Sequence, residues 1–325
     1  MRGRVGLLCL ILSLVAATPA SAYWVWTPWT GKWINPKTQP KDTPEEQFSY
    51  ANDLYERKDY ARAVREFLRL VRHYAKASQA PDAQYFAGQC YEQLHQPYQA
   101  FLTYKKLVET YPYSGRFKDA IARSYALGEA LFSGVKVRPI QQIPVAVPAL
   151  DKAAEIFELI VAQAPYGEYG DKAQFKLGQT YRKLSQYGEA LKAFEKLVQE
   201  YKQSPLLEEA RYNTAFCAKQ LSLKPAYDQE STDQAITWFE EFIDSHPGSE
   251  LLPEAQQSLQ QLRGHKAESL FRIAEFYARQ KKWPSAALYY RRIVDRYADT
   301  PWASQAVAHL TALEQAGHIP SVRAS

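Results

Sequence analysis

The feature that most constrains this chain is a pattern of four residue columns that recurs six times along its 325 residues. In every unit an alanine is followed four residues later by an aromatic residue, and three residues after that by a large apolar residue. A small residue, Gly or Ala, precedes this trio in each unit. The four columns are Ala51, Gly88, Gly128, Gly178, Ala215 and Ala274; Ala63, Ala100, Ala153, Ala190, Ala235 and Ala286; Phe67, Tyr104, Phe157, Phe194, Phe239 and Tyr290; and Leu70, Leu107, Ile160, Leu197, Phe242 and Ile293.

The spacing of these columns predicts pairs of α-helices. Positions i, i+4 and i+7 lie on one face of a helix, so the trio forms the apolar stripe of a second helix, helix B. The small residue lies on the first helix, helix A, where it allows helix B to approach closely. In the fourth unit Tyr181 fills the gap beside Gly178, and Tyr187 closes the turn between the helices. These spacings match the tetratricopeptide repeat, whose units bury their apolar faces by stacking on their neighbours.

We therefore expect an all-α fold, a tetratricopeptide-repeat superhelix of about six helix pairs with a C-terminal capping helix over residues 302–316. Three stretches interrupt the compact pattern. Prolines in residues 135–148 predict an extended surface loop, and a shorter insertion surrounds residues 224–227. Residues 253–263 add extra helix before the sixth unit, and we expect a break in that helix near Gly264.

The N-terminus has the features of a secretory signal. Arg2 and Arg4 precede an apolar run over residues 5–15, and small residues at 20–22 predict cleavage before Tyr23. No later segment reaches the roughly 20 apolar residues that a membrane-spanning helix needs. We expect an exported protein of the periplasm, associated with the outer membrane.

The predicted organisation has four parts. Residues 1–22 are the signal peptide, and residues 23–43 are an aromatic, proline-containing N-terminal segment. Residues 44–316 are the tetratricopeptide-repeat array, and residues 317–325 are a flexible tail.

The cysteines predict neither a lipid anchor nor a disulfide. Cys9 follows Leu8, where a lipidated cysteine needs a small residue, and very little apolar sequence precedes it. Cys90 and Cys217 lie on A helices three repeats apart, which places them more than roughly 20 Å from each other. A disulfide requires Cα atoms within roughly 7 Å, so we expect both to be buried free thiols.

Charge and motifs exclude several kinds of function. Without Arg2 and Arg4 the chain has 38 basic and 35 acidic residues, a net charge of +3, and no basic stripe for nucleic acid. The six histidines are scattered without the paired spacing of a zinc site, and no phosphate-binding or nucleophile motif is present. We expect no cofactor, no metal, no nucleic-acid partner and no catalytic residue.

A ladder of aromatic residues is the first candidate binding feature. Three residues before the small residue of each A helix lies a Phe or Tyr, and in such a superhelix the A helices line the concave groove. These rings could hold a bound polypeptide, and Arg182 and Lys183 of the fourth unit could fix its register. The alternative is that the rings pack between neighbouring repeats and that the polar groove positions are simply solvated. The ladder comprises Phe48, Tyr85, Tyr125, Phe175, Tyr212 and Phe271.

The second candidate feature is the tryptophan-rich mature N-terminus. Trp24, Trp26, Trp29 and Trp33 are four of the seven tryptophans in the chain, and Pro28 within this stretch excludes a helix. Exposed indole rings favour a membrane interface or a protein partner. The alternative is a small hairpin that folds back and caps the first repeat.

The repeats, together with the helix end Tyr111-Pro112-Tyr113-Ser114, resemble the BamD family of outer-membrane assembly lipoproteins, which are periplasmic tetratricopeptide-repeat proteins. The resemblance extends over residues 44–316, with its best local match at residues 47–114. It implies binding to the β-barrel assembly machine and to unfolded outer-membrane proteins. Two departures are six units, where that family typically has five, and the absence of a lipidation motif.

Two other kinds of protein share parts of this pattern. Coordinator proteins of the Tol-Pal system have similar helix ends, but they usually begin with a coiled coil, whereas residues 23–43 are aromatic and interrupted by proline. Soluble lytic transglycosylases use a catalytic Glu followed by Ser, as in Glu268-Ser269. Here that dipeptide leads into a complete helix pair without the downstream sequence of those enzymes. The sequence thus favours a non-catalytic scaffold that binds other envelope proteins.

Overall fold

The computed structural model of the protein describes residues 24–27, 31–34, 39–137, 147–222 and 229–320. Within these ranges the chain forms thirteen α-helices and four short strands, which confirms the predicted all-α repeat fold. The helices are α1 Pro44–Glu56, α2 Tyr60–His73, α3 Ala80–Gln93, α4 Pro97–Thr110, α5 Phe117–Phe132, α6 Leu150–Gln163, α7 Gly170–Lys183, α8 Tyr187–Glu200, α9 Leu207–Ser222, α10 Gln229–Ser245, α11 Leu252–Arg279, α12 Trp283–Arg296 and α13 Pro301–Gln315. The strands are β1 Val25–Thr27, β2 Lys32–Ile34, β3 Lys136–Val137 and β4 Val147–Pro148.

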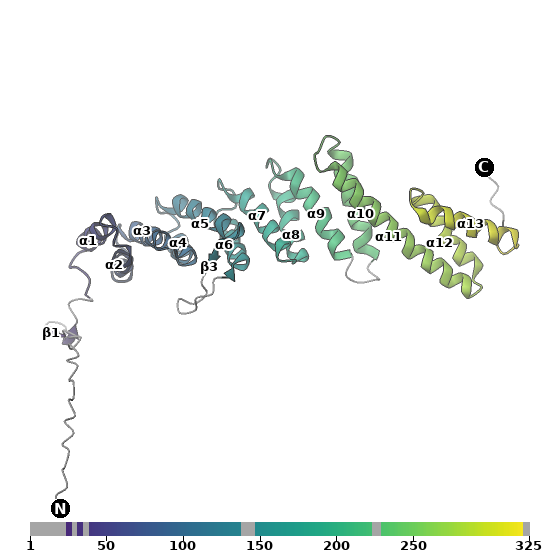
Figure 1. Cartoon of the computed structure of the whole chain (residues 1–325). Helices are drawn as coiled ribbons and strands as arrows, with labels where there is room; N and C mark the ends of the chain where they lie inside the picture. The colour runs from purple at the N-terminus through teal and green to yellow at the C-terminus, as the bar shows by residue number, and fades with distance from the viewer. Residues whose placement is uncertain (1–23, 28–30, 35–38, 138–146, 223–228, 321–325) are drawn as a thin grey trace, which may run out of the picture.

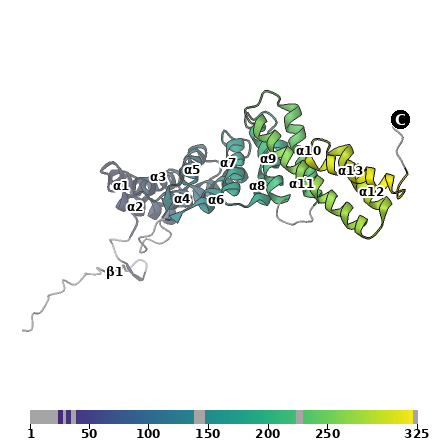
Figure 2. The same ribbon diagram turned by 45° about the vertical axis from the view of Figure 1, so that its right-hand side comes forward.

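The helices stack in pairs along an elongated array (Figure 1). The A helices α1, α3, α5, α7, α9 and α11 alternate with the B helices α2, α4, α6, α8, α10 and α12. The order of the pairs is the same in the turned view of Figure 2. Beyond the sixth pair, α13 buries Ala303, Ala306 and Leu313 against the last units. It is therefore the predicted capping helix.

Each pair is built on contact between the small residue of helix A and the aromatic ring of helix B. A Cβ atom added to Gly178 would lie 2.7 Å from the ring of Phe194, and one added to Gly88 would lie 2.3 Å from the ring of Tyr104. The glycines therefore allow the B ring to lie directly on the A backbone. The six ring positions, Phe67, Tyr104, Phe157, Phe194, Phe239 and Tyr290, are at most 1% exposed.

Four A helices end on a non-glycine residue in the left-handed conformation. These residues are Lys58, His95, Ser185 and Lys281, with φ between 56° and 60°. The amide of Ser185 donates to the carbonyl of Arg182, and the next amide, of Gln186, donates to the carbonyl of Tyr181. This is the Schellman arrangement, which satisfies the last carbonyls of a helix and reverses the chain direction. It sets the tight turn between helices A and B in the compact units.

The expected break near Gly264 is absent, because α11 runs without interruption from Leu252 to Arg279. Its first half packs on α9 and α10, and its second half pairs with α12. The Arg263 guanidinium lies at the middle of this long helix, where it donates to both Asp299 oxygens at 2.8–3.2 Å and to Glu240 at 3.1 Å. One continuous helix thus connects the fifth and sixth units.

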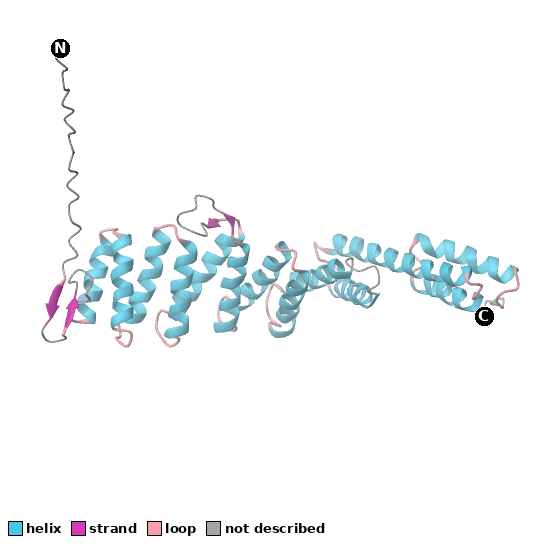
Figure 3. Ribbon diagram, turned by 90° about the horizontal axis from the view of Figure 1, so that it is seen from below, coloured by secondary structure: helices cyan, strands magenta, loops and turns pink. Residues whose placement is uncertain are grey.

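The two insertions differ in how much of them the structure describes. The larger one begins and ends in a small hairpin in which Lys136 pairs with Pro148, and Val137 with Val147. This strand pair, drawn in magenta in Figure 3, was not predicted, because the prolines pointed only to an extended loop. Residues 138–146 and the predicted insertion at residues 224–227 lie outside the described residues.

The structure describes part of each end of the chain. The predicted signal peptide lies outside the described residues, and the N-terminal segment forms the hairpin β1–β2. Residues 317–320, assigned from the sequence to a flexible tail, pack instead on the last units. Ile319 is 6% exposed, and the His318 ring stacks on Trp283 at 4.4 Å between centroids.

Candidate protein-binding groove

The predicted aromatic ladder is largely buried. Tyr85, Tyr125, Phe175, Tyr212 and Phe271 are at most 9% exposed, and Phe48 is half-buried. Each ring packs on the helix-B ring of its own unit, with centroids 5.3–6.1 Å apart. The six pairs are Phe48–Phe67, Tyr85–Tyr104, Tyr125–Phe157, Phe175–Phe194, Tyr212–Phe239 and Phe271–Tyr290.

The rings thus pack within the fold, as the alternative proposed, but their helix-B partners belong to the same unit and not to a neighbouring repeat. The physical reason is that the ring of helix A fills the space beside the glycine or alanine against which the B ring lies. A polypeptide bound along the A helices would meet other side chains. Binding of such a polypeptide in the groove stays a prediction.

Polar side chains on the A helices join each unit to the next. The A helices of all six units are linked in this way, either by a hydrogen bond or by an ion pair. The contacts are Tyr55–Gln89 at 3.3 Å, Glu92–Arg123 at 3.3 Å, Glu129–Lys176 at 3.5 Å, Arg182–Asn213, and Tyr212–Glu254 at 3.1 Å. These polar residues orient neighbouring units relative to one another, so they are not simply solvated.

The two predicted register residues have defined partners. Arg182 donates to the side-chain oxygen of Asn213, and its guanidinium lies 5.4 Å from the centroid of the Phe216 ring. The ammonium of Lys183 donates to the Phe132 carbonyl at 3.1 Å and lies 3.6 Å from the centroid of the Phe132 ring. A cation at that position satisfies a carbonyl at the C-terminal end of α5. Lys183 of the fourth unit thus contacts the third unit through Phe132.

Arg182 lies in a groove that the A helices α7, α9 and α11 form together. The groove encloses about 420 Å³. It is lined by Gln179, Arg182, Glu208, Glu209, Tyr212, Asn213, Glu250, Leu251 and Glu254. Four carboxylates and one guanidinium give this lining a formal charge of −3. The groove is therefore an acidic surface with a single cation at one side.

Tyr212 connects the floor of this groove to its acidic rim. Burial raises the pKa of Tyr212 to about 12, and its hydrogen bond to Glu254 acts in the same direction. The phenol is thus a neutral donor at physiological pH. Glu209, Glu250 and Glu254 are exposed, so their carboxylates remain available to a ligand.

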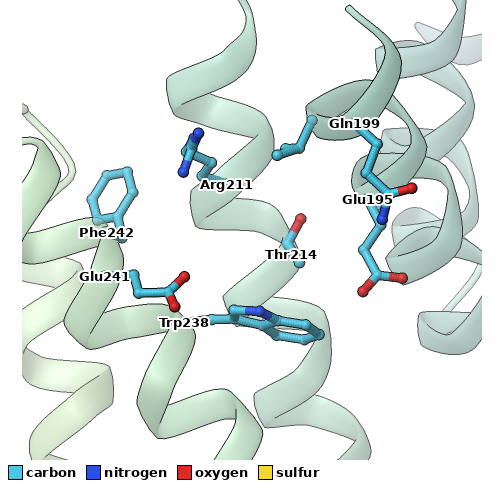
Figure 4. A pocket seen from close by; sticks show the side chains of 8 residues that line it. Glu195, Gln199, Arg211, Thr214, Trp238, Glu241 and Phe242 are labelled. Carbon is cyan, nitrogen blue, oxygen red and sulfur yellow. The ribbon is translucent and has the colours of Figure 1, made fainter. Parts of the chain in front are cut away.

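A smaller cavity of about 140 Å³ lies on the other side of α9, between the B helices α8 and α10. Figure 4 shows Trp238 and Phe242 of α10 on one side, Arg211 and Thr214 of α9 in the middle, and Glu195 of α8 opposite. Burial raises the pKa of Glu195. This cavity is part of the packing between units four and five, and the acidic groove is the larger of the two.

Sequence reasoning missed a column of buried glutamines. Gln47, Gln84 and Gln174 lie four residues before the small residue of their A helices and are at most 2% exposed. Each donates its amide N–H to a helix-B carbonyl in the same unit, at 2.8–3.1 Å. The recurrence of Gln at one position in three units is the signal that could have revealed this contact.

The cysteines are as predicted. Cys90 and Cys217 are both buried free thiols, and burial raises the pKa of each to about 12. Neither thiol is available as a nucleophile at neutral pH.

The tryptophan-rich segment forms a hairpin whose described indole rings remain exposed. Trp26 pairs directly with Trp33, and their ring centroids are 5.7 Å apart. Trp24, Trp26 and Trp33 are 56%, 47% and 62% exposed. A hairpin was one of the predicted forms, but these rings do not belong to the buried cluster of the first unit. Trp29 lies outside the described residues.

The described residues contain no group of three or more His, Cys, Asp or Glu side chains placed to hold a metal ion. Among the helices in the described ranges, none is long and apolar enough to cross a membrane.

Comparison with known families matches both halves of the chain. The profile of the YfiO family, described as outer membrane lipoprotein, matches residues 146–321, which is more than half of the chain. A tetratricopeptide-repeat profile matches residues 50–115. The family match thus lies in the C-terminal half, whereas the sequence resemblance had its best local match in the first two units.

Individual relatives are more distant. The outer membrane protein assembly factor BamD of Caulobacter vibrioides is 21% identical over 160 residues, which cover 49% of this chain and 52% of that protein. BamD of Xylella fastidiosa is 24% identical over 164 residues, covering 47% and 56% respectively. The chain therefore spans about half the length of the curated relatives it matches.

Solved repeat proteins have lower similarity still. The C-terminal part of a tetratricopeptide repeat-containing protein from Cytophaga hutchinsonii covers 82% of this chain and 88% of its own, with 15% identity and a TM-score of 0.33. The crystal structure of MamA covers 63% of this chain and 92% of its own, with 16% identity and a TM-score of 0.33.

Proposed function

Because the chain belongs to the YfiO family of outer membrane lipoproteins, we propose that it is a non-catalytic scaffold of the periplasm that takes part in the assembly of outer-membrane β-barrel proteins. Its partners on this proposal are other envelope proteins, namely components of the β-barrel assembly machine and unfolded outer-membrane proteins. The similarity to BamD proteins over about half of their length supports this partner class.

The observation that carries the proposal is the acidic groove of α7, α9 and α11. All of its lining residues lie between residues 179 and 254, within the part of the chain that the family profile matches. The groove is formed by three successive units and is large enough for several side chains of a bound polypeptide. The carboxylates of the groove favour a bound segment that contains Lys or Arg. Arg182 can donate hydrogen bonds to a carboxylate or a backbone carbonyl of that segment.

The contacts between neighbouring units support a scaffold role. The polar contacts between neighbouring A helices fix the groove before any partner arrives, so little conformational entropy is lost on binding. Tyr212 contributes to this in two ways, because its ring packs against Phe239 and its hydroxyl donates to Glu254. The groove thus has a preformed polar surface on an apolar support.

The dipeptide that resembles a transglycosylase motif does not favour catalysis. Glu268 forms an ion pair with Arg272 on the same helix. A general acid for glycoside cleavage needs instead a carboxyl group buried in a substrate pocket. We therefore assign no reaction to this helix.

Affinity capture from solubilised envelopes tests the proposal. The wild-type chain should retain components of the β-barrel assembly machine, and the double variant Glu209→Lys, Glu250→Lys should retain much less. A matched control reverses two exposed acidic residues on B helices, Glu109→Lys and Asp295→Lys, and should behave as wild type. Retention should also fall as the salt concentration rises, because exposed charges are screened.

The outcomes separate the proposal from its rivals. Recovery of Tol-Pal components in place of barrel-assembly components would reject the proposed partners but would retain the proposed role as a scaffold. Equal recovery by the groove variant and the control variant would reject the groove as the binding surface. Release of peptidoglycan fragments by the purified chain would reject the non-catalytic assignment.

A further inference from the structure

The hairpin β1–β2 presents three tryptophans on one face. Residues directly opposite each other in an antiparallel pair project to the same side, so Trp26 and Trp33 share a face. Trp24 precedes Trp26 by two residues in an extended chain and therefore lies on that side as well. With exposures of 56%, 47% and 62%, these rings form an aromatic surface that the described repeat array leaves uncovered, and the ring centroids of Trp26 and Trp33 lie 5.7 Å apart.

The chain that follows the hairpin in the sequence meets the array beside exposed basic residues. Residues 41 and 42 are held to the first unit, because the hydroxyl of Tyr74 donates to the carbonyl of Lys41 at 2.6 Å and to that of Asp42 at 3.2 Å. Tyr74 directly follows the end of α2, and Arg72 and Lys76 are exposed on either side of it.

Helix α2 extends this basic surface. It contains four arginines and one glutamate, and the arginines lie at i, i+3, i+7 and i+10, within one face of the helix. They are Arg62, Arg65, Arg69 and Arg72. Two of them pair with acidic neighbours, Arg62 with Asp59 and Arg69 with Glu66. Among the described residues, Arg65 and Arg72 form no ion pair and are exposed, so their charge is available to an anionic surface.

From these two features we infer that the hairpin and the end of α2 form a peripheral membrane-binding surface for a bilayer that contains anionic phospholipid. The indole rings enter the region between headgroups and acyl chains, where tryptophan is enriched, and the arginines lie against lipid phosphates. Neither feature takes part in the acidic groove, so this surface is independent of the function proposed above.

A bilayer fits this surface better than a protein partner does. A stable protein interface uses roughly 800 Å² and about 20–30 residues on each side. From residue 24 to residue 34 the hairpin spans eleven residues of sequence, fewer than such an interface uses. A bilayer needs only exposed aromatic rings and nearby positive charge, and both are present.

Vesicle sedimentation with the purified exported chain tests the inference. The probes are vesicles of phosphatidylcholine with phosphatidylglycerol in equal parts, and vesicles of phosphatidylcholine alone. The wild-type chain should bind the anionic vesicles more strongly. The triple variant Trp24→Ser, Trp26→Ser, Trp33→Ser should bind them at least about tenfold less, because it loses the apolar area that enters the interface.

A charge variant separates the two contributions. Each arginine at an anionic lipid surface contributes roughly fivefold to partitioning, so Arg65→Gln with Arg72→Gln should weaken binding to anionic vesicles by at least that factor. The same variant should bind phosphatidylcholine vesicles as the wild type does. The matched controls are Tyr113→Ser with Tyr166→Ser, which removes two rings that are 100% and 84% exposed, and Lys192→Gln with Lys196→Gln on α8. Both controls should leave vesicle binding unchanged.

Thermal unfolding completes the test. The tryptophan variant should keep the wild-type unfolding temperature, because its rings do not belong to the buried cluster of the first unit. A lowered unfolding temperature with unchanged vesicle binding would show that the hairpin caps the first repeat, and would overturn the inference. Failure of the wild-type chain to bind either kind of vesicle would overturn it as well.

Discussion

The buried glutamine of the fourth unit offers a quantitative test of what holds a helix pair together. Gln174 is 2% exposed, and its amide nitrogen donates to the Ala193 carbonyl of α8 at 2.8 Å. Its other polar atom, Oε1, has no hydrogen-bond partner among the described residues. The side chain thus combines one satisfied donor with one buried acceptor that is left unpaired.

The two polar atoms act in opposite directions on stability. A hydrogen bond of this kind contributes about 1 kcal/mol, whereas a buried acceptor without a partner costs about 1–3 kcal/mol. Methionine has nearly the same shape as glutamine and removes both atoms together. We therefore expect Gln174→Met to be as stable as the wild type or up to about 2 kcal/mol more stable. The variant Gln174→Ala leaves a cavity in addition and should lose about 2–4 kcal/mol.

Urea unfolding followed by circular dichroism measures both changes in the free energy of unfolding. The methionine and alanine variants differ mainly in side-chain volume, so the difference between them isolates packing from hydrogen bonding. If Gln174→Met lost as much stability as Gln174→Ala, the amide hydrogen bond would be the main contribution of this residue. That result would refute the reasoning.

Three further predictions test other parts of the fold. Ser185→Gly should stabilise the chain by about 0.5–1 kcal/mol in urea unfolding, because Ser185 has a φ of 58° that costs an L-residue more than glycine. Burial raises the pKa of Cys90 and Cys217 from 9.0 to about 12, so unfolding favours their ionisation. The contribution of the two neutral thiols to the free energy of unfolding is complete below pH 9, and above pH 9 it falls by about 1.4 kcal/mol per thiol for each pH unit. The free energy of unfolding should therefore fall less between pH 8 and pH 10 in the double alanine variant than in the wild type. Arg263→Lys should lower the unfolding free energy by about 1–2 kcal/mol, because an ammonium cannot replace the paired hydrogen bonds to Asp299; an unchanged value would show that this ion pair is solvated.

The apolar part of the fold was predictable from the sequence because it depends on local periodicity. The column of Ala63 and its equivalents marks the stripe of each B helix, and the glycine column marks where two helices meet. The capping helix followed from the same reasoning, since the last unit needs a cover. The prediction of free thiols followed from the distance between Cys90 and Cys217, which lie three repeats apart.

The polar and terminal features were harder to predict, because they depend on contacts between units. Sequence periodicity placed Tyr85 and its equivalents on the A helices. Only the packed structure shows that the aromatic ring of helix B in the same unit packs against each of these side chains. Arg182 finds its partner Asn213 in the next unit, at a position that no spacing within one repeat specifies. The continuity of α11 through Gly264 likewise reflects packing on both neighbouring units, which outweighs the weak helix propensity of glycine.

Site-specific photocrosslinking in growing cells tests the central claim most directly, namely that the A-helix groove binds other envelope proteins. A photoreactive amino acid at Glu250, on the rim of the groove, should crosslink to other proteins of the envelope. The same amino acid at Glu109, exposed on a B helix, should give few crosslinks. Equal crosslinking at the two positions, or none at Glu250, would contradict this account.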